Sequence, residues 1–134
     1  MKYLLDTNVW IDYLTGRYPA VVTHIQESPP DELCLSSVVM AELRYGAAKS
    51  RRKRSNHRLL DTLAEEVRCV DFDVHAAATY GDVRTAVEKR GEPLGAYDML
   101  IAAHALSLGL VLITDNEREF KRVRSLVVEN WRRE

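Results

Sequence analysis

Residue patterns that often reveal a compartment or a metal site are missing from this sequence. Among 134 residues there are only two cysteines, Cys34 and Cys69, which form neither a CxxC pair nor a zinc-binding pattern. Both lie in apolar stretches, so we expect two reduced cysteines in the core. The four histidines have no ligand spacing such as HExxH, and we expect them at the surface or at its boundary.

Long apolar runs and an excess of one charge are also absent. No run reaches the ~18 apolar residues of a membrane-spanning helix, and no signal peptide is apparent, so we expect a cytoplasmic protein without a membrane partner. The 19 Lys and Arg residues nearly balance the 20 Asp and Glu residues, so no overall basic field indicates a nucleic-acid partner. A local basic patch would still suffice to bind one. The GxSxG turn of serine hydrolases and the GxxxxGK phosphate loop are missing too.

The sequence does contain an alternation of short apolar segments with longer helical patterns. The predicted strands are the segments 2–5, 33–35, 67–70, 110–113 and 126–128. This order predicts βαβ units and therefore an α/β fold with a mainly parallel sheet. The strands do not alternate between polar and apolar residues, which is typical of strands covered on both faces. With no internal linker, we expect a single domain, residues 1–134.

Four acidic residues fall where such a sheet binds its ligands, outside the carboxyl ends of the strands. Asp6 directly follows the first predicted strand and Asp115 follows the fourth, while Glu42 and Asp98 lie in helices that start near the same edge. Each could merely cap a helix or turn. Glu42 and Asp98 have apolar neighbours, where an uncompensated acid is costly. Four carboxylates at one edge indicate a hard cation, Mg²⁺ or Mn²⁺, rather than zinc.

The sequence at these acids closely resembles the PIN-domain nucleases and, within them, the VapC-like ribonuclease toxins of type II toxin–antitoxin systems. The resemblance is carried by LLDTNVWIDYL, SSVVMAELRYGA, AYDMLIAAHAL and LITDNEREFKRV followed by LVVENW, which together run from residue 3 to residue 131. It implies a three-layer α/β/α fold whose central parallel sheet has about five strands. It also implies that the first and fourth strands are neighbours, which would bring Asp6 and Asp115 together.

The resemblance implies roles for the residues of these motifs. Asp6, Glu42 and Asp98 would be catalytic and would bind Mg²⁺, or Mn²⁺ in its place. The fourth site position is either Asp115 or Asn116. Four further residues would support the site by orienting a turn, holding a metal-bound water or capping a helix. They are Thr7, Asn8, Thr114 and Glu119. The implied reaction is endonucleolytic hydrolysis of RNA by metal-activated water, frequently with transfer RNA as the target.

A basic run, KSRRKRSNHR, offers a possible grip on RNA phosphates. Its charges are Lys49, Arg51, Arg52, Lys53 and Arg54. Phosphate contacts of this kind give affinity without sequence choice. The alternative is a solvated corner between two helices.

The first predicted helix, 7–14, is apolar on nearly all sides, with Asp12 as its main polar residue. Such a helix is covered on more than one side, either by its own domain or by a partner. Trp10, Tyr13 and Leu14 are candidate partner contacts. The resemblance favours an antitoxin there and implies a homodimer. Two other interpretations remain, a housekeeping PIN ribonuclease and a non-catalytic interaction domain.

Overall fold

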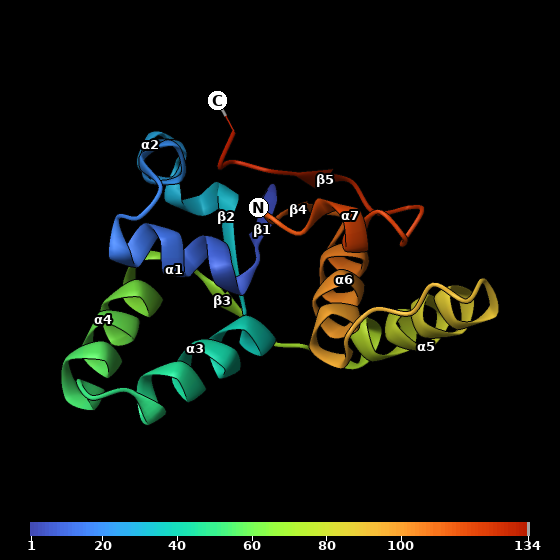
Figure 1. Cartoon of the computed structure of the whole chain (residues 1–134), viewed down its shortest axis with the longest axis horizontal. Coiled ribbons are helices and arrows are strands. Elements are labelled where there is room, and N and C mark those ends of the chain that lie inside the picture. Colours follow the sequence, from blue (N-terminus) through green and yellow to red (C-terminus); the bar gives the residue numbers. More distant parts are fainter. Residues whose placement is uncertain (134) are drawn as a thin grey trace.

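The structure, a computed structural model, describes residues 1–133 and has a five-stranded parallel sheet at its centre (Figure 1). The strand order is β3-β2-β1-β4-β5, so the first strand lies in the middle. The strands are β1 (Tyr3–Leu5), β2 (Leu33–Ser36), β3 (Cys69–Val70), β4 (Val111–Ile113) and β5 (Val128–Glu129). The predicted α/β fold with adjacent first and fourth strands is therefore confirmed.

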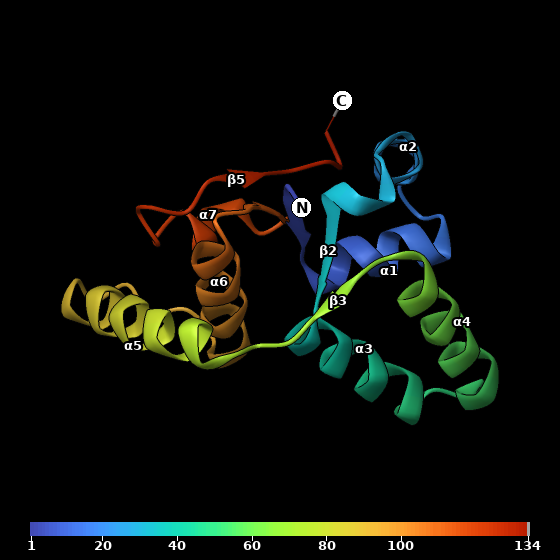
Figure 2. The same ribbon diagram turned by 180° about the vertical axis from the view of Figure 1, so that it is seen from behind.

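Helices cover the sheet and complete a three-layer α/β/α arrangement, with α1 to α4 in one group and α5 with α6 in another (Figures 1 and 2). The helices are α1 (Thr7–Thr15), α2 (Pro19–Glu27), α3 (Ser37–Lys49), α4 (Lys53–Glu66), α5 (Val74–Lys89), α6 (Ala96–Leu108) and α7 (Glu117–Phe120), and a 3₁₀ turn spans Pro30–Glu32. None of the helices within residues 1–133 is long and apolar enough to cross a membrane.

The centre of the sheet is also the point where the strand order reverses. Chain connections run outward from β1 through β2 to β3, and then return to β4 on the other side of β1. Leu4 pairs with Leu112 and Leu5 pairs with Ile113 in parallel register. The residues that follow these strands, Asp6 and Thr114, must therefore lie side by side. This is the position where open α/β sheets bind their ligands.

Helix boundaries follow the local chemistry of the sequence. Ser36 ends β2 and caps α3, because its hydroxyl accepts a hydrogen bond from the Val38 N–H at 3.1 Å. Asp73 caps α5 in the same way through the Ala76 N–H at 3.0 Å. Gly16 ends α1 with a positive φ of 70°, a conformation that glycine adopts without steric cost. The Ser36 cap fixes where α3 begins at the ligand-binding edge, and Gly16 fixes where α1 ends.

Two expectations from the sequence are wrong. Cys69 is exposed rather than in the core, because β3 is an edge strand that pairs with β2 alone, whereas Cys34 is buried as expected. His104 is buried in α6, where its Nδ1 lies 2.8 Å from the Ser36 hydroxyl. Helix α4 begins at Lys53, so part of the basic run is helical.

Candidate active site

Asp6 follows β1 directly and caps helix α1. Its Oδ1 accepts a hydrogen bond from the Thr7 N–H at 2.8 Å, and its Oδ2 accepts one from the Thr114 hydroxyl at 2.8 Å. Only 7% of Asp6 is exposed. Burial, together with the neighbouring charges of Asp98 and Glu42, raises the pKa of Asp6 to about 6, although both hydrogen bonds favour the charged form. Asp6 is thus a cap and also a carboxylate whose charge the fold compensates only in part.

Glu42 projects from α3 toward the start of α1. Its Oε1 accepts a hydrogen bond from the Thr7 hydroxyl at 2.7 Å, a contact between residues 35 positions apart. Thr7 therefore touches two acids, Asp6 through its backbone and Glu42 through its side chain. One short polar residue at the first position of α1 sets the spacing between them.

Asp98 lies in the first turn of α6, whose cap residue, Gly95, has no side chain to bind the free N–H groups. An acid suits this position because the helix dipole favours negative charge there. Burial raises the pKa of Asp98, and the charges of Glu119 and Glu42 add to this effect. The sequence-predicted acids of three different helices are therefore near enough to influence one another.

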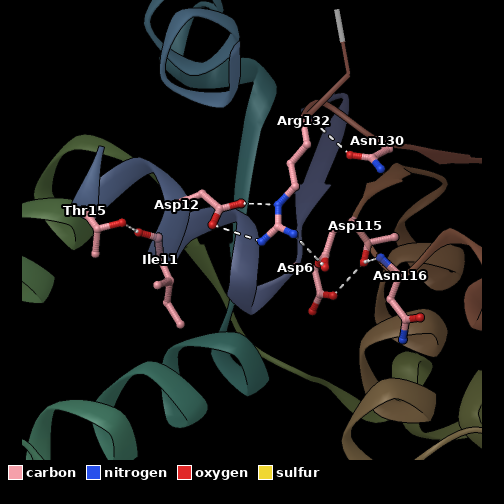
Figure 3. A network of polar contacts seen from close by, with 9 residues as sticks. Asp6, Ile11, Asp12, Thr15, Asp115, Asn116, Asn130 and Arg132 are labelled. Carbon is pink, nitrogen blue, oxygen red and sulfur yellow. Dashed lines mark hydrogen bonds and ion pairs between the residues drawn. The ribbon is translucent and has the colours of Figure 1, made fainter. Parts of the chain in front are cut away.

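The turn after β4 supplies the remaining predicted residues. Thr114 is fully buried, and its hydroxyl also accepts a hydrogen bond from the Asn116 N–H at 3.0 Å. The Asn116 side chain donates to Glu119 Oε2 at 3.1 Å, so Asn116 orients Glu119. Asp115 instead lies against Arg132, with Oδ2 at 3.1 Å from Nη1 (Figure 3). Whether Asp115 or Asn116 is the fourth site residue stays a prediction, as do the roles of the other acids.

The chemistry of these donors fits a hard divalent cation. Asp6, Glu42, Asp98 and Glu119 present only oxygen atoms, and none of the ion pairs formed within residues 1–133 involves them. No three His, Cys, Asp or Glu side chains in this part of the chain already lie at metal-ligand spacing. Mg²⁺ does not require such a cage, since it keeps several waters and binds through one or two carboxylates.

One pair of residues near this edge was not predicted from the sequence. Asp12 lies within α1 and is only 2% exposed, and Arg132 donates two hydrogen bonds to it, at 2.7 and 3.1 Å (Figure 3). The only sign in the sequence was that Asp12 is the single acid in an otherwise apolar helix. Nothing in the sequence identified its partner, which is 120 positions away. Asn8, in the first turn of α1, is exposed.

The basic run forms the corner between α3 and α4. Five side chains of this corner are exposed, Lys49, Arg51, Arg52, Lys53 and Arg54. Together with Ser50, Ser55 and Arg58 they surround a shallow hollow of about 680 Å³. Helix α3 runs from the acidic edge to this corner and carries Glu42 on the way (Figure 1). Glu42 and Lys49 are seven residues apart in α3, so about 10 Å of helix separates the acidic edge at Glu42 from the basic corner.

The expectation that Trp10 contacts a partner is wrong, because Trp10 is completely buried within the chain and has no surface to offer. Tyr13 and Leu14 remain partly exposed. Leu14 and the 41%-exposed Ile11 instead line an apolar groove of about 290 Å³ between α1, α3 and α4. Glu42 lies at the rim of this groove, which therefore adjoins the acidic edge.

Comparisons with known proteins agree with the fold and the motifs. Residues 3–126 match the model of the PIN domain family. The chain is 37% identical to Ribonuclease VapC2 of Rickettsia felis over 133 residues, and 37% identical to the tRNA(fMet)-specific endonuclease VapC of Shigella flexneri over 131 residues, with 98% of each chain covered. It is also similar to the crystal structure of VapBC2 from Rickettsia felis bound to a promoter DNA fragment, with a TM-score of 0.90, 34% identity, and 98% and 99% of the two chains covered.

Proposed function

The chain belongs to the PIN domain family and resembles VapC ribonucleases along its whole length, and on this basis we propose that it is a ribonuclease toxin of a type II toxin–antitoxin pair. The observation that supports this most strongly is the set of uncompensated carboxylates at the carboxyl ends of β1 and β4. We take residues 1–134 as a single domain that performs the reaction, and a homodimer as its working form.

Three acids would hold the cation in this proposal, namely Asp6, Glu42 and Asp98. When bound there, Mg²⁺, or Mn²⁺ in its place, would supply a hydroxide nucleophile at neutral pH and would offset the charge that develops on the phosphate. The chain itself holds these acids in position. Thr7 links Asp6 to Glu42, and Thr114 binds the far oxygen of Asp6, so these two carboxylates have a fixed orientation before substrate arrives.

Transfer RNA is the substrate class that we propose. The Shigella flexneri relative is named for cleavage of a transfer RNA, and this chain offers exposed basic residues that suit a folded polyanion. The basic corner at Arg51 and Arg52 would contact phosphates of a stem while a single-stranded loop enters the acidic edge. Shape and phosphate contacts are the usual basis for recognising structured RNA.

An antitoxin chain is the proposed protein partner. The relative from Rickettsia felis was crystallised as a VapBC complex. The groove lined by Ile11, Leu14 and Leu59 is apolar and open, and Glu42 at its rim would attract a basic side chain of the antitoxin. An apolar segment bound there would cover the approach to the acids, which is a direct way to neutralise the enzyme.

Sequencing of RNA 5′ ends after brief induction tests the function. Wild type is compared with Asp98→Asn and with Asp82→Asn, a control that removes an exposed acid of α5. We expect new ends at defined sites in transfer RNA with wild type and with Asp82→Asn, and none with Asp98→Asn. Purified protein should show the same cleavage with Mg²⁺ and lose it with EDTA.

Other outcomes would identify the alternatives. Cleavage confined to ribosomal or messenger precursors, without growth arrest, would indicate a housekeeping ribonuclease. Absence of metal-dependent cleavage by pure wild-type protein would indicate a non-catalytic interaction domain.

A further inference from the structure

The guanidinium of Arg132 connects two elements that hold Asp6, and it is fixed from three directions. Its Nε and Nη2 donate to the two oxygens of Asp12 in α1, and its Nη1 donates to Asp115 in the turn after β4, at 3.1 Å. Its face lies over the Tyr18 ring, 4.1 Å from the centroid, just before α2. Bidentate binding of this kind fixes orientation as well as distance. We call Asp12, Arg132 and Asp115 the Arg132 clamp.

Each end of the Arg132 clamp leads to the same carboxylate. Asp12 belongs to α1, and Asp6 is the cap of that helix, so a shift of α1 moves the Asp6 backbone. Asp115 follows Thr114, whose hydroxyl donates to Asp6 Oδ2 at 2.8 Å. The clamp therefore controls the separation between the helix that carries Asp6 and the turn that orients its outer oxygen (Figure 3).

Its ion pair with Arg132 assigns Asp115 to this clamp. Its Oδ2 accepts from Arg132, and its Oδ1 is buried without a hydrogen-bond partner within residues 1–133. Asp6, Glu42 and Asp98 have no cationic side chain of the same part of the chain paired with them. Asp115 thus differs from these three acids in pairing with a cationic side chain, which it shares with Asp12.

We propose that Arg132 is a positioning residue that acts through Asp12 and Asp115 to set the geometry of Asp6, and that Asp115 serves this clamp instead of binding metal. This inference rests on the proposed nuclease function. Displacement of a reacting group by about 1 Å can cost about 100-fold in rate. Loss of the clamp therefore lowers kcat and leaves KM, which depends on the RNA-binding surface, nearly unchanged.

The test measures kcat and KM on a short fluorogenic RNA, at a temperature where circular dichroism shows every variant folded. Arg132→Gln should lower kcat by about 100-fold and Arg132→Lys by about 10-fold, with KM held within about 2-fold. Arg133→Gln is the matched control, since it removes the neighbouring charge, whose side chain is 73% exposed and pairs with Glu117. We expect it to behave as wild type.

Two substitutions of Asp115 separate the clamp from metal binding. The Asn oxygen of Asp115→Asn can still accept the Arg132 N–H, so this variant should keep activity within about 5-fold, whereas Asp115→Ala should lose about 100-fold. Arg132→Gln combined with Asp115→Ala should be no worse than either single variant. Equal losses in Asp115→Asn and Asp115→Ala, or losses that multiply in the double variant, would overturn the proposal. Both Asp115 variants leave the Asp12–Arg132 pair intact, so they remain decisive if Arg132→Gln does not fold.

A readout independent of catalysis uses the metal-free protein. Hydrogen exchange at the Thr114 and Asn116 amides, which donate to Glu129 O and to the Thr114 hydroxyl, should be about 10-fold faster in Arg132→Gln than in wild type or Arg133→Gln. Unchanged exchange there would refute the clamp. If wild type cleaves no RNA, or if Asp98→Asn cleaves as wild type does, the proposed function fails, and hydrogen exchange still decides whether Arg132 holds the turn.

Discussion

Helix α1 joins two buried carboxylates that the protein treats in opposite ways. Asp6 at its start and Asp12 within it are both less than a tenth exposed. Asp12 receives two N–H groups of Arg132, so its charge is matched inside the chain. Asp6 receives only an amide and a hydroxyl, and burial, together with two further acids, raises its pKa. An acid that the fold leaves without a cation is one that is available to bind a cation from solution.

The largest expected effect that tests this contrast is on catalysis. Asp6→Asn should lower kcat/KM by about 1,000-fold, because the amide keeps the cap but cannot supply the charge that holds a cation. Steady-state cleavage of a transfer RNA measures it. Near-normal activity of Asp6→Asn would show that Asp6 is only a cap.

Removal of Arg132 tests the other side of the contrast through stability. Arg132→Ala leaves Asp12 buried and unpaired, and should lower the free energy of unfolding by about 2–3 kcal/mol, at the lower limit for buried pairs because Arg132 is itself partly exposed. Urea denaturation at pH 7 measures it. Arg133→Ala is the control and should change stability by less than about 0.5 kcal/mol, as for other exposed pairs. Equal effects of the two substitutions would mean that the Asp12–Arg132 pair stabilises the fold no more than an exposed ion pair does.

Removal of the Asp6 charge should change stability in the opposite direction to removal of Arg132, and the change should depend on pH. Because its pKa is raised from 3.8 to about 6, protonation of Asp6 favours the folded state, and this contribution is present below pH 3.8 and lost as the pH rises through 6. Metal-free Asp6→Asn should therefore be about 3 kcal/mol more stable than wild type at pH 7, with most of the difference lost by pH 4. Urea titrations at several pH values measure it. A difference that is constant with pH would contradict the raised pKa.

Mg²⁺ should offset much of the free-energy cost of keeping Asp6 charged in the folded protein. At about 30 times the dissociation constant, a cation that binds only the folded state adds about 2 kcal/mol of stability. Thermal unfolding of wild type should shift upward with MgCl₂, and that of Asp6→Asn should not. Equal shifts in both proteins would reflect salt rather than a site.

The smallest expected effect lies at the basic corner. Arg51→Gln with Arg52→Gln should raise KM about 10-fold at low salt and flatten its salt dependence, because two phosphate contacts are lost, with kcat and stability unchanged. Lys89→Gln, an exposed charge at the end of α5, is the control. If KM is unchanged at all salt concentrations, the basic corner does not contact RNA and is only a solvated surface.

Local signals in the sequence were sufficient for most of the fold and for the first acids. Asp6 lies at a strand end, Ser36 is a cap and Gly16 is a helix end, and each is determined by a few adjacent residues. Glu42 and Asp98 were placed near the same edge by their predicted helix starts, and the family motifs supplied their roles. Arg132 could not be predicted, because its contacts with Asp12 and Asp115 arise only when β5 is in place. Trp10 was misjudged for a related reason, since its complete burial is a tertiary property that the sequence of one helix does not determine.

The parallel pairing of β1 with β4 has a consequence for synthesis of the protein. Asp6 and Thr114 are 108 positions apart, and Asp12 and Arg132 are 120 positions apart. A nascent chain that has reached only α6 lacks β4, the strand that pairs with β1 in the middle of the sheet. It also lacks Arg132, the cationic side chain that pairs with Asp12 in α1. Residue 132 therefore has to be synthesised and has to leave the ribosome before the candidate active site can assemble.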